Sequence, residues 1–137
     1  MTSNTLHQVA VAGASGRMGH MLIEAVLASG DCQLAGALDM AASPAIGQFA
    51  TGFLGQASGP VITADLAVGL ANARVLIDFT RPEGTLQHLR ACRTQGVHAV
   101  IGTTGFSEAQ KVEIAAAARD IAIVMAPNMS VGVNVTL

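Results

Sequence analysis

Short apolar runs alternate along the chain with segments of helical periodicity. Five runs have the length of β-strands, at residues 9–12, 33–38, 75–77, 97–101 and 121–125. Between them, apolar residues recur every three or four positions, as on one face of a helix; in the first such segment they are Met18, Met21, Leu22, Ala25 and Val26. Continuously apolar strands that alternate with helices are typical of parallel βαβ units with both sheet faces covered. The pattern predicts the α/β class, with a doubly wound, mostly parallel sheet and helices on both faces.

Polar residues mark the start of two later helices. At residues 80–83 (Thr-Arg-Pro-Glu), we expect the Thr80 hydroxyl to accept from the N–H of Glu83, while proline suits the first turn. Ser107 and Gln110 begin another helix in the same way, with one expected apolar face of Ala109, Val112 and Ala116. Residues 40–60 have no sustained period and are rich in Gly, Ser, Ala and Pro, which predicts a long loop with room for a helical turn.

Composition and charge narrow the class further. Of 137 residues, 51% are hydrophobic and 12% charged, and the net charge is −2, so the chain has no basic field for nucleic acid or a membrane surface. No apolar stretch approaches the roughly 18 residues of a membrane span, and residues 1–8 lack a signal-peptide pattern, so we expect a soluble cytoplasmic protein. The two cysteines and four histidines lack ligand spacing, and no metal site is expected.

A glycine-rich turn follows the first apolar run. Gly13 permits a tight turn, Gly16 allows backbone amides to approach a pyrophosphate, and Gly19 allows close packing of the next helix. Glycines alone also occur in ordinary turns, but a position between strand and helix, followed by an acid, favours a Rossmann-like dinucleotide loop. Arg17, in the first helical turn, could add a charge to the phosphate or remain in solvent.

Asp39 ends the second apolar run, 20 residues after Gly19, where a carboxylate can accept both ribose hydroxyls of an adenosine. The alternative is a simple turn residue. At about 4 Å and an effective dielectric near 20, repulsion between this carboxylate and a 2′-phosphate is on the order of 4 kcal/mol per unit charge. Solvent reduces this energy greatly, but a neighbouring arginine would normally offset what remains. The next residue is Met40, and no Lys or Arg lies between Arg17 and Arg74. We therefore expect NADH to bind at least as well as NADPH.

The remaining strand ends carry weaker signals. Residues 102–105 (Gly-Thr-Thr-Gly) offer amides and hydroxyls where a nicotinamide or its ribose would lie, or they form a turn that caps the next helix. We expect Asp78 to fix the loop before Thr80 rather than to act as a base. Arg81 could steer an anion or pair with Glu83. The chain has no tyrosine, which excludes a short-chain dehydrogenase with its catalytic tyrosine, and it has no G-x-S-x-G elbow.

Four blocks together, at residues 11–19, 77–85, 100–106 and 128–134, closely resemble the bacterial dihydrodipicolinate reductases (4-hydroxy-tetrahydrodipicolinate reductases) of lysine and diaminopimelate synthesis. The resemblance implies hydride transfer from NAD(P)H to a cyclic, dicarboxylated, imine-type substrate. It also implies four groups of cofactor contacts. Those at the pyrophosphate come from Gly13, Ala14, Ser15, Gly16, Arg17 and Met18, and that at the adenosine ribose comes from Asp39. Those near the nicotinamide ribose come from Gly102, Thr103 and Thr104, and those beside the nicotinamide ring come from Ala126, Pro127, Asn128 and Met129.

The chain also departs from the family pattern. Members that favour NADPH tend to have a basic residue in place of Met40, and many have an aromatic residue in place of Met129. Family members continue into a substrate domain with a His-His pair, a Lys and a Gly-Thr, none of which occurs here. We expect residues 1–130 to form an NAD(P)-binding domain and 131–137 to begin a hinge.

These departures lead to expectations about the isolated chain. It would contain no catalytic residue, would be inactive alone, and would be monomeric, because the family tetramer is built mainly from the missing domain. The alternative is a non-catalytic NAD-binding module that reports redox state to a partner. Another Rossmann dehydrogenase family would not explain the blocks at 78–85 and 102–106.

Overall fold

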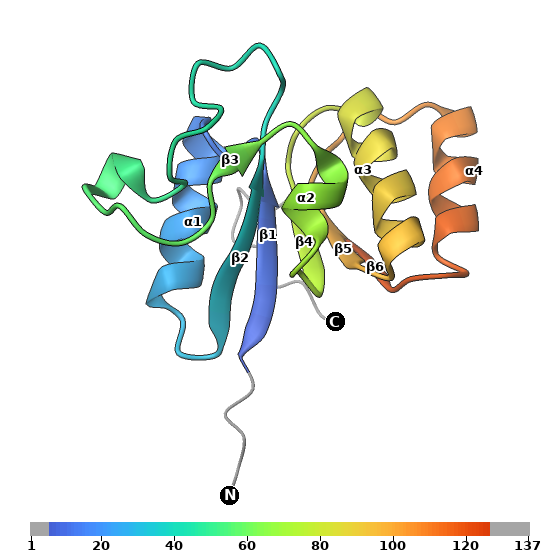
Figure 1. Ribbon diagram of the computed structural model, residues 1–137. Helices are drawn as coiled ribbons and strands as arrows, with labels where there is room; N and C mark the ends of the chain where they lie inside the picture. Colours follow the sequence, from blue (N-terminus) through green and yellow to red (C-terminus); the bar gives the residue numbers. More distant parts are fainter. Residues whose placement is uncertain (1–5, 127–137) are drawn as a thin grey trace, which may run out of the picture.

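The computed structural model describes residues 6–126, which form a six-stranded parallel sheet between two layers (Figure 1). The strand order is β3-β2-β1-β4-β5-β6, and every strand pair is parallel. The strands are β1 (His7–Ala12), β2 (Cys32–Leu38), β3 (Ile62–Thr63), β4 (Val75–Asp78), β5 (His98–Ile101) and β6 (Ile123–Met125). This is the order of a doubly wound dinucleotide-binding fold, and it confirms the predicted class.

The helices lie on both sides of this sheet, as the apolar pattern predicts. In Figure 1, α1 (Arg17–Ala28) covers one face, and α2 (Leu66–Leu70), α3 (Pro82–Gln95) and α4 (Glu108–Ala117) cover the other. Alternate side chains of β1 serve the two layers, with Val9 and Val11 in the cluster beneath α1 and Ala10 and Ala12 in the cluster beneath α2 and α3. The glycine turn therefore follows a central strand of the sheet, at its carboxyl end.

The long loop between β2 and β3 is confirmed, and it contains a single 3-10 turn at Gly52–Leu54. The ring of Phe53 in this turn stacks on His20 of α1, with centroids 3.8 Å apart and planes 1° from parallel. Segment 48–50 also bonds to residues 60–62, since Ile62 N donates to Gln48 O and Ala50 N to Pro60 O. These contacts fold the loop back over α1.

The predicted buried face of α1 is only partly correct. Gly19, Ile23 and Val26 are buried, whereas Met21 is 58% exposed and Met18 40% exposed. The physical reason lies at Gly19, where a Cβ would lie only 2.0 Å from the carbonyl oxygen of Gly13. This close approach turns the helix so that its smallest residue, rather than methionine, faces the loop after β1.

In α4, the predicted face is wrong. Ile114 and Ala117 are buried, while Val112 is 70% exposed. The helix lies beside α3, and a two-bond pair between Arg90 of α3 and Glu113 of α4 joins them at 2.7 and 3.0 Å. Packing against a neighbouring helix, rather than directly over the sheet centre, selects a different stripe of residues.

Helix boundaries follow the sequence signals at α4 and in part at α3, where Pro82 lies in the first turn as predicted. Ser107 accepts from Gln110 N at 3.2 Å, and Gln110 Oε1 accepts from Ser107 N at 2.7 Å, which confirms the capping box. The N-cap of α3 is Arg81, without a side-chain cap, so the predicted capping role of Thr80 is wrong. Its hydroxyl donates instead to Asp78.

Within residues 6–126, no helix is long and apolar enough to cross a membrane. The predicted domain limit at residue 130 and hinge at 131–137 lie outside the described residues.

Candidate dinucleotide site

Several polar residues lie at the carboxyl ends of the central strands, at one edge of the sheet. The chain reverses its direction of progress across the sheet between β1 and β4, since β2 lies on one side of β1 and β4 on the other. Ligands of open α/β sheets bind at such a switch point, outside the carboxyl ends of the strands. The glycine loop after β1 lies at this point, with Asp39 after β2, Asp78 at the end of β4 and Gly102 after β5.

The glycine loop presents an open helix N-terminus. Gly13 has φ of +68°, a conformation that favours glycine, and the N–H of Ala14 donates to Leu38 O at 3.0 Å. The N-cap of α1 is Gly16, which has no side chain to cap the helix. The first-turn N–H groups of Arg17 and Met18 therefore remain available to an anion. Arg17 and Met18 are both exposed beside this opening.

Asp39 lies against the glycine loop, as its distance from Gly19 in the sequence predicts. Its Oδ2 accepts from the backbone N–H of Ser15 at 2.9 Å and from the Ser15 hydroxyl, and its Oδ1 accepts from Met40 N at 2.8 Å. The hydroxyl of Ser43 lies 3.3 Å from that of Ser15. The long loop thus brings Ser43 to the site, a residue that no sequence motif indicated.

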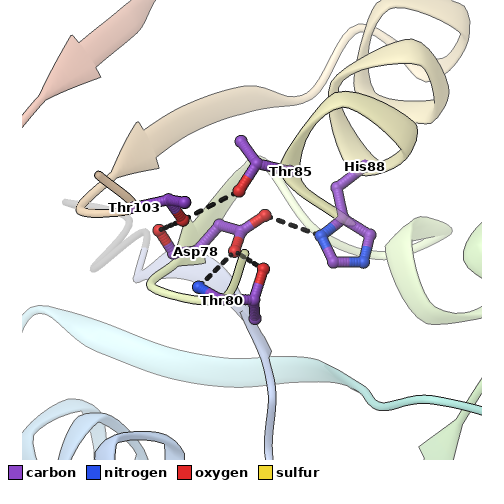
Figure 2. A network of polar contacts seen from close by, with 5 residues as sticks. All are labelled: Asp78, Thr80, Thr85, His88 and Thr103. Carbon is purple, nitrogen blue, oxygen red and sulfur yellow. Dashed lines mark hydrogen bonds and ion pairs between the residues drawn. The ribbon is translucent and has the colours of Figure 1, made fainter. Parts of the chain in front are cut away.

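A second polar network centres on Asp78, whose side chain is 1% exposed (Figure 2). Oδ2 of Asp78 lies 2.6 Å from Nδ1 of His88, which donates because a carboxylate can only accept. Oδ1 accepts from the N–H and the hydroxyl of Thr80 at 3.0 and 2.5 Å. The expectation that Asp78 fixes the loop before Thr80 is therefore confirmed.

The backbone carbonyl of Asp78 connects this network to the loop after β5. It accepts from Gly102 N at 2.8 Å and from the Thr103 hydroxyl at 3.4 Å. The hydroxyls of Thr103 and Thr85 are 2.8 Å apart. The side chain of Thr103 therefore faces inward (Figure 2), so only its backbone is free to meet a ligand.

These contacts decide which groups are charged. Burial raises the pKa of Asp78, but the hydrogen bond and charge of His88 and the two bonds from Thr80 outweigh it, so the pKa is lower than usual. Burial, with a smaller contribution from the charge of Asp78, raises the pKa of the Cys92 thiol to about 12. Cys92 is therefore a protonated core residue, and its chemistry is not that of a nucleophile.

The remaining predicted residues differ in their placement. Gly102 lies under the ring of Phe79, Thr104 is exposed, and Ala126 is buried with its N–H donating to Ile101 O at 2.7 Å. Pro127, Asn128 and Met129 lie outside the described residues. Arg81 is exposed, and none of the ion pairs found in residues 6–126 joins it to Glu83. In the same part of the chain, no group of three or more His, Cys, Asp or Glu side chains could hold a metal ion.

The arrangement as a whole defines a class. A doubly wound parallel sheet, a glycine loop that leads into an uncapped helix, and a carboxylate at the end of β2 are the features of a Rossmann-type dinucleotide-binding domain. A family model described as dihydrodipicolinate reductase, N-terminus, matches residues 7–129. The chain therefore belongs to the dihydrodipicolinate reductase family, in its N-terminal part.

Curated relatives agree with this assignment. The chain is 65% identical over 130 residues to a 4-hydroxy-tetrahydrodipicolinate reductase of Herminiimonas arsenicoxydans, covering 95% of the chain and 48% of the relative. It is 61% identical over 137 residues to a protein of the same name from Bordetella pertussis, covering 100% of the chain and 51% of the relative. The chain spans about half the length of the curated relatives it matches.

Solved structures support the fold. A dipicolinate-bound dihydrodipicolinate reductase from Paenisporosarcina sp. TG-14 matches with a TM-score of 0.71 at 24% identity, over 93% of this chain and 49% of that one. GenD2 from gentamicin A biosynthesis, in complex with NAD, also has a TM-score of 0.71, at 19% identity over 90% of this chain and 35% of that one. At these identities the likeness concerns the fold alone.

Proposed function

We propose that the whole protein is a cytoplasmic 4-hydroxy-tetrahydrodipicolinate reductase of lysine and diaminopimelate synthesis, and that this chain is its nicotinamide-dinucleotide-binding part. The relatives at 61–65% identity support this activity. The dipicolinate in the Paenisporosarcina structure supports a small cyclic dicarboxylate as substrate. The bound dinucleotide supplies the hydride, and the residues of this chain hold and orient it.

The residues present fit such a cofactor. The uncapped N-terminus of α1 suits the pyrophosphate, and a Cβ on Gly16 would meet only the Gly13 carbonyl, at 3.4 Å, so space remains above the loop. Asp39, on the β2 side of the loop, suits the adenosine ribose. The nicotinamide half then lies on the β4 and β5 side, beside Phe79 and Gly102.

The observation that carries the proposal is the position of Asp39. Its carboxylate is held by Ser15 and Met40 at the rim of the glycine loop, where it can accept from the two ribose hydroxyls of an adenosine. A 2′-phosphate would place a second anion against this carboxylate without a neighbouring Lys or Arg from residues 18–73. NADH therefore binds at least as tightly as NADPH.

Titration of the chain with NADH and with NADPH, followed by cofactor fluorescence, tests this proposal. We expect Asp39→Asn to weaken NADH binding by about tenfold or more, because hydrogen bonds to a charged group contribute about 1.5–3 kcal/mol. The same change should narrow the difference between NADH and NADPH. Asp31→Asn, an equal charge change on an exposed residue at the opposite end of β2, is the matched control.

A clear preference for NADPH would refute the role given to Asp39. Failure of both cofactors to bind would refute the proposed function itself. The activity of the whole protein is measured as oxidation of NADH in the presence of the cyclic substrate.

A further inference from the structure

The carboxylate of Asp78 joins helix α3 to the turn at Phe79 and Thr80. His88, whose side chain is 15% exposed, donates to Oδ2 from α3 at 2.6 Å, and Thr80 occupies Oδ1 with two bonds. One oxygen is thus held by the helix while the other holds the turn, as Figure 2 shows. No buried polar side-chain atom in the described part of the chain is left without a partner, so this carboxylate is fully satisfied.

The turn lies between the two loops of the candidate site. A Cβ on Gly13 would be 3.1 Å from Cγ2 of Thr80, and a Cβ on Gly102 would be 2.0 Å from the ring of Phe79. The two side chains therefore rest directly on the glycine loop after β1 and on the loop after β5. Movement of the turn therefore changes the surface at Gly13, on the β4 side of the glycine loop, and at Gly102, whereas Ser15 and Asp39 lie on the β2 side.

Among the hydrogen bonds of residues 6–126, His88 is the only partner of Oδ2 of Asp78, since both bonds from Thr80 go to Oδ1. Without the imidazole, this oxygen would be buried and charged but unpaired, a condition that native proteins avoid. The carboxylate would then rotate or admit water to recover a donor. Because Thr80 is bonded to the same carboxylate, the turn would move with it.

We propose that His88 is a positioning residue of the dinucleotide site, which acts through Asp78 to hold Phe79 and Thr80 against Gly102 and Gly13. The nicotinamide half of the site depends on this support, whereas the adenosine half, built by Ser15 and Asp39, does not. The inference rests on the proposed function, because it assigns the β4 and β5 side to the nicotinamide. His88 itself is not a catalytic residue, since its bond is to Asp78.

The experiment compares two ligands on four forms of the chain: wild type, His88→Ala, His88→Asn and Gln87→Ala. NADH spans both halves of the site, and 5′-AMP carries the adenosine half only. We expect His88→Ala to weaken NADH binding about tenfold, as it would if about one chain in ten kept the turn in its binding position, with 5′-AMP within about twofold of wild type. His88→Asn places an amide N–H near the position of Nδ1 and should restore NADH binding to within about threefold.

Gln87→Ala is the matched control, because Gln87 is the exposed neighbour on the same helix. It should leave both ligands unchanged. Equal weakening of NADH and 5′-AMP by His88→Ala, or no rescue by a folded His88→Asn, would overturn the inference, because a general loss of structure would then explain the data. Loss of NADH binding in Gln87→Ala would overturn it for the same reason.

A nuclear magnetic resonance measurement on the wild-type chain decides the matter where His88→Ala does not fold. The Nδ1 proton of His88 should shift on addition of NADH and stay in place on addition of 5′-AMP. An Nδ1 resonance that NADH leaves unchanged overturns the inference alone. Failure of NADH to bind the wild-type chain overturns both the inference and the proposed function.

Discussion

Replacing Gly19 by alanine should separate α1 from the glycine loop. An added Cβ would lie 2.0 Å from the carbonyl oxygen of Gly13 and 2.9 Å from Cα of Ala14, so the first turn of α1 has to retreat by about 1 Å or more to reach ordinary contact. The loop cannot yield instead, because Gly13 has its positive φ and Ala14 is bonded to β2. The helix would therefore move, and Ile23 and Val26 would shift within the core.

The size of the effect follows from two opposing contributions. Overpacking of this kind costs about 1–3 kcal/mol, while alanine in place of a helical glycine gains about 0.5–1 kcal/mol. We expect the free energy of unfolding to fall by about 1–2 kcal/mol and the Tm to fall by about 3–8 °C, measured by circular dichroism. The retreat also moves the helix N-terminus from the pyrophosphate, so NADH binding should weaken about tenfold, the factor for about 1.4 kcal/mol.

Gly84→Ala is the control for this stability measurement. Gly84 is also a helical glycine, but its Cβ would meet Thr80 Oγ1 at 3.4 Å, which is ordinary contact. It should raise the stability by up to about 1 kcal/mol. A Gly19→Ala chain with an unchanged or higher Tm would show that the close approach at Gly13 does not determine the position of α1.

Two further predictions use the same site. Gly16→Ala should leave the Tm within about 2 °C of wild type, because the added Cβ would meet only Gly13 O, at 3.4 Å. It should nevertheless weaken NADH binding at least about tenfold, because the methyl group fills the space of the pyrophosphate. Unchanged affinity in a fluorescence titration would place the pyrophosphate elsewhere. Because the folded pKa of Asp78 lies below its unfolded value of 3.8, this group stabilises the fold above that value, and the contribution is lost as pH falls through the folded pKa. Urea unfolding should therefore find Asp78→Asn less stable than wild type at about pH 7 but with a smaller acid loss between about pH 5 and pH 2; parallel acid losses would contradict the assignment.

The order and class of the elements could be predicted because parallel strands that are buried on both faces appear in the sequence as continuous apolar runs, as at residues 97–101. The position of Asp39 could also be predicted, since strand, turn and helix lengths place a strand-end acid beside the loop. The buried faces of the helices were harder to predict from the sequence. In α1 the closest contact is made by Gly19, which hydrophobic periodicity does not count. In α4 the residues buried beside α3 are Ile114 and Ala117, which leaves Val112 exposed.

The pairing of Asp78 with His88 could not be predicted from the sequence, for a different reason. The two residues come from a strand and a helix whose relative angle is set by packing of Leu86 and Leu89 under α3, and no local pattern encodes that angle. An acid at a strand end, followed by a histidine two turns into the next helix, indicates such a pair only when the position of the helix relative to the strand is known.

Thr80 shows how the buried carboxylate overrides a local rule. As an N-cap, its hydroxyl would have contributed about 0.5–2 kcal/mol to α3 at an exposed helix end. Withdrawn from Asp78, the same hydroxyl would have left a charged oxygen without one of its donors in a site that is 1% exposed, where water is a poor substitute and the loss exceeds about 1–3 kcal/mol. The free helix N–H groups near Arg81, by contrast, can bind solvent. The capping motif therefore gives way, and α3 begins one residue later, with the threonine turned toward the site that its helix borders.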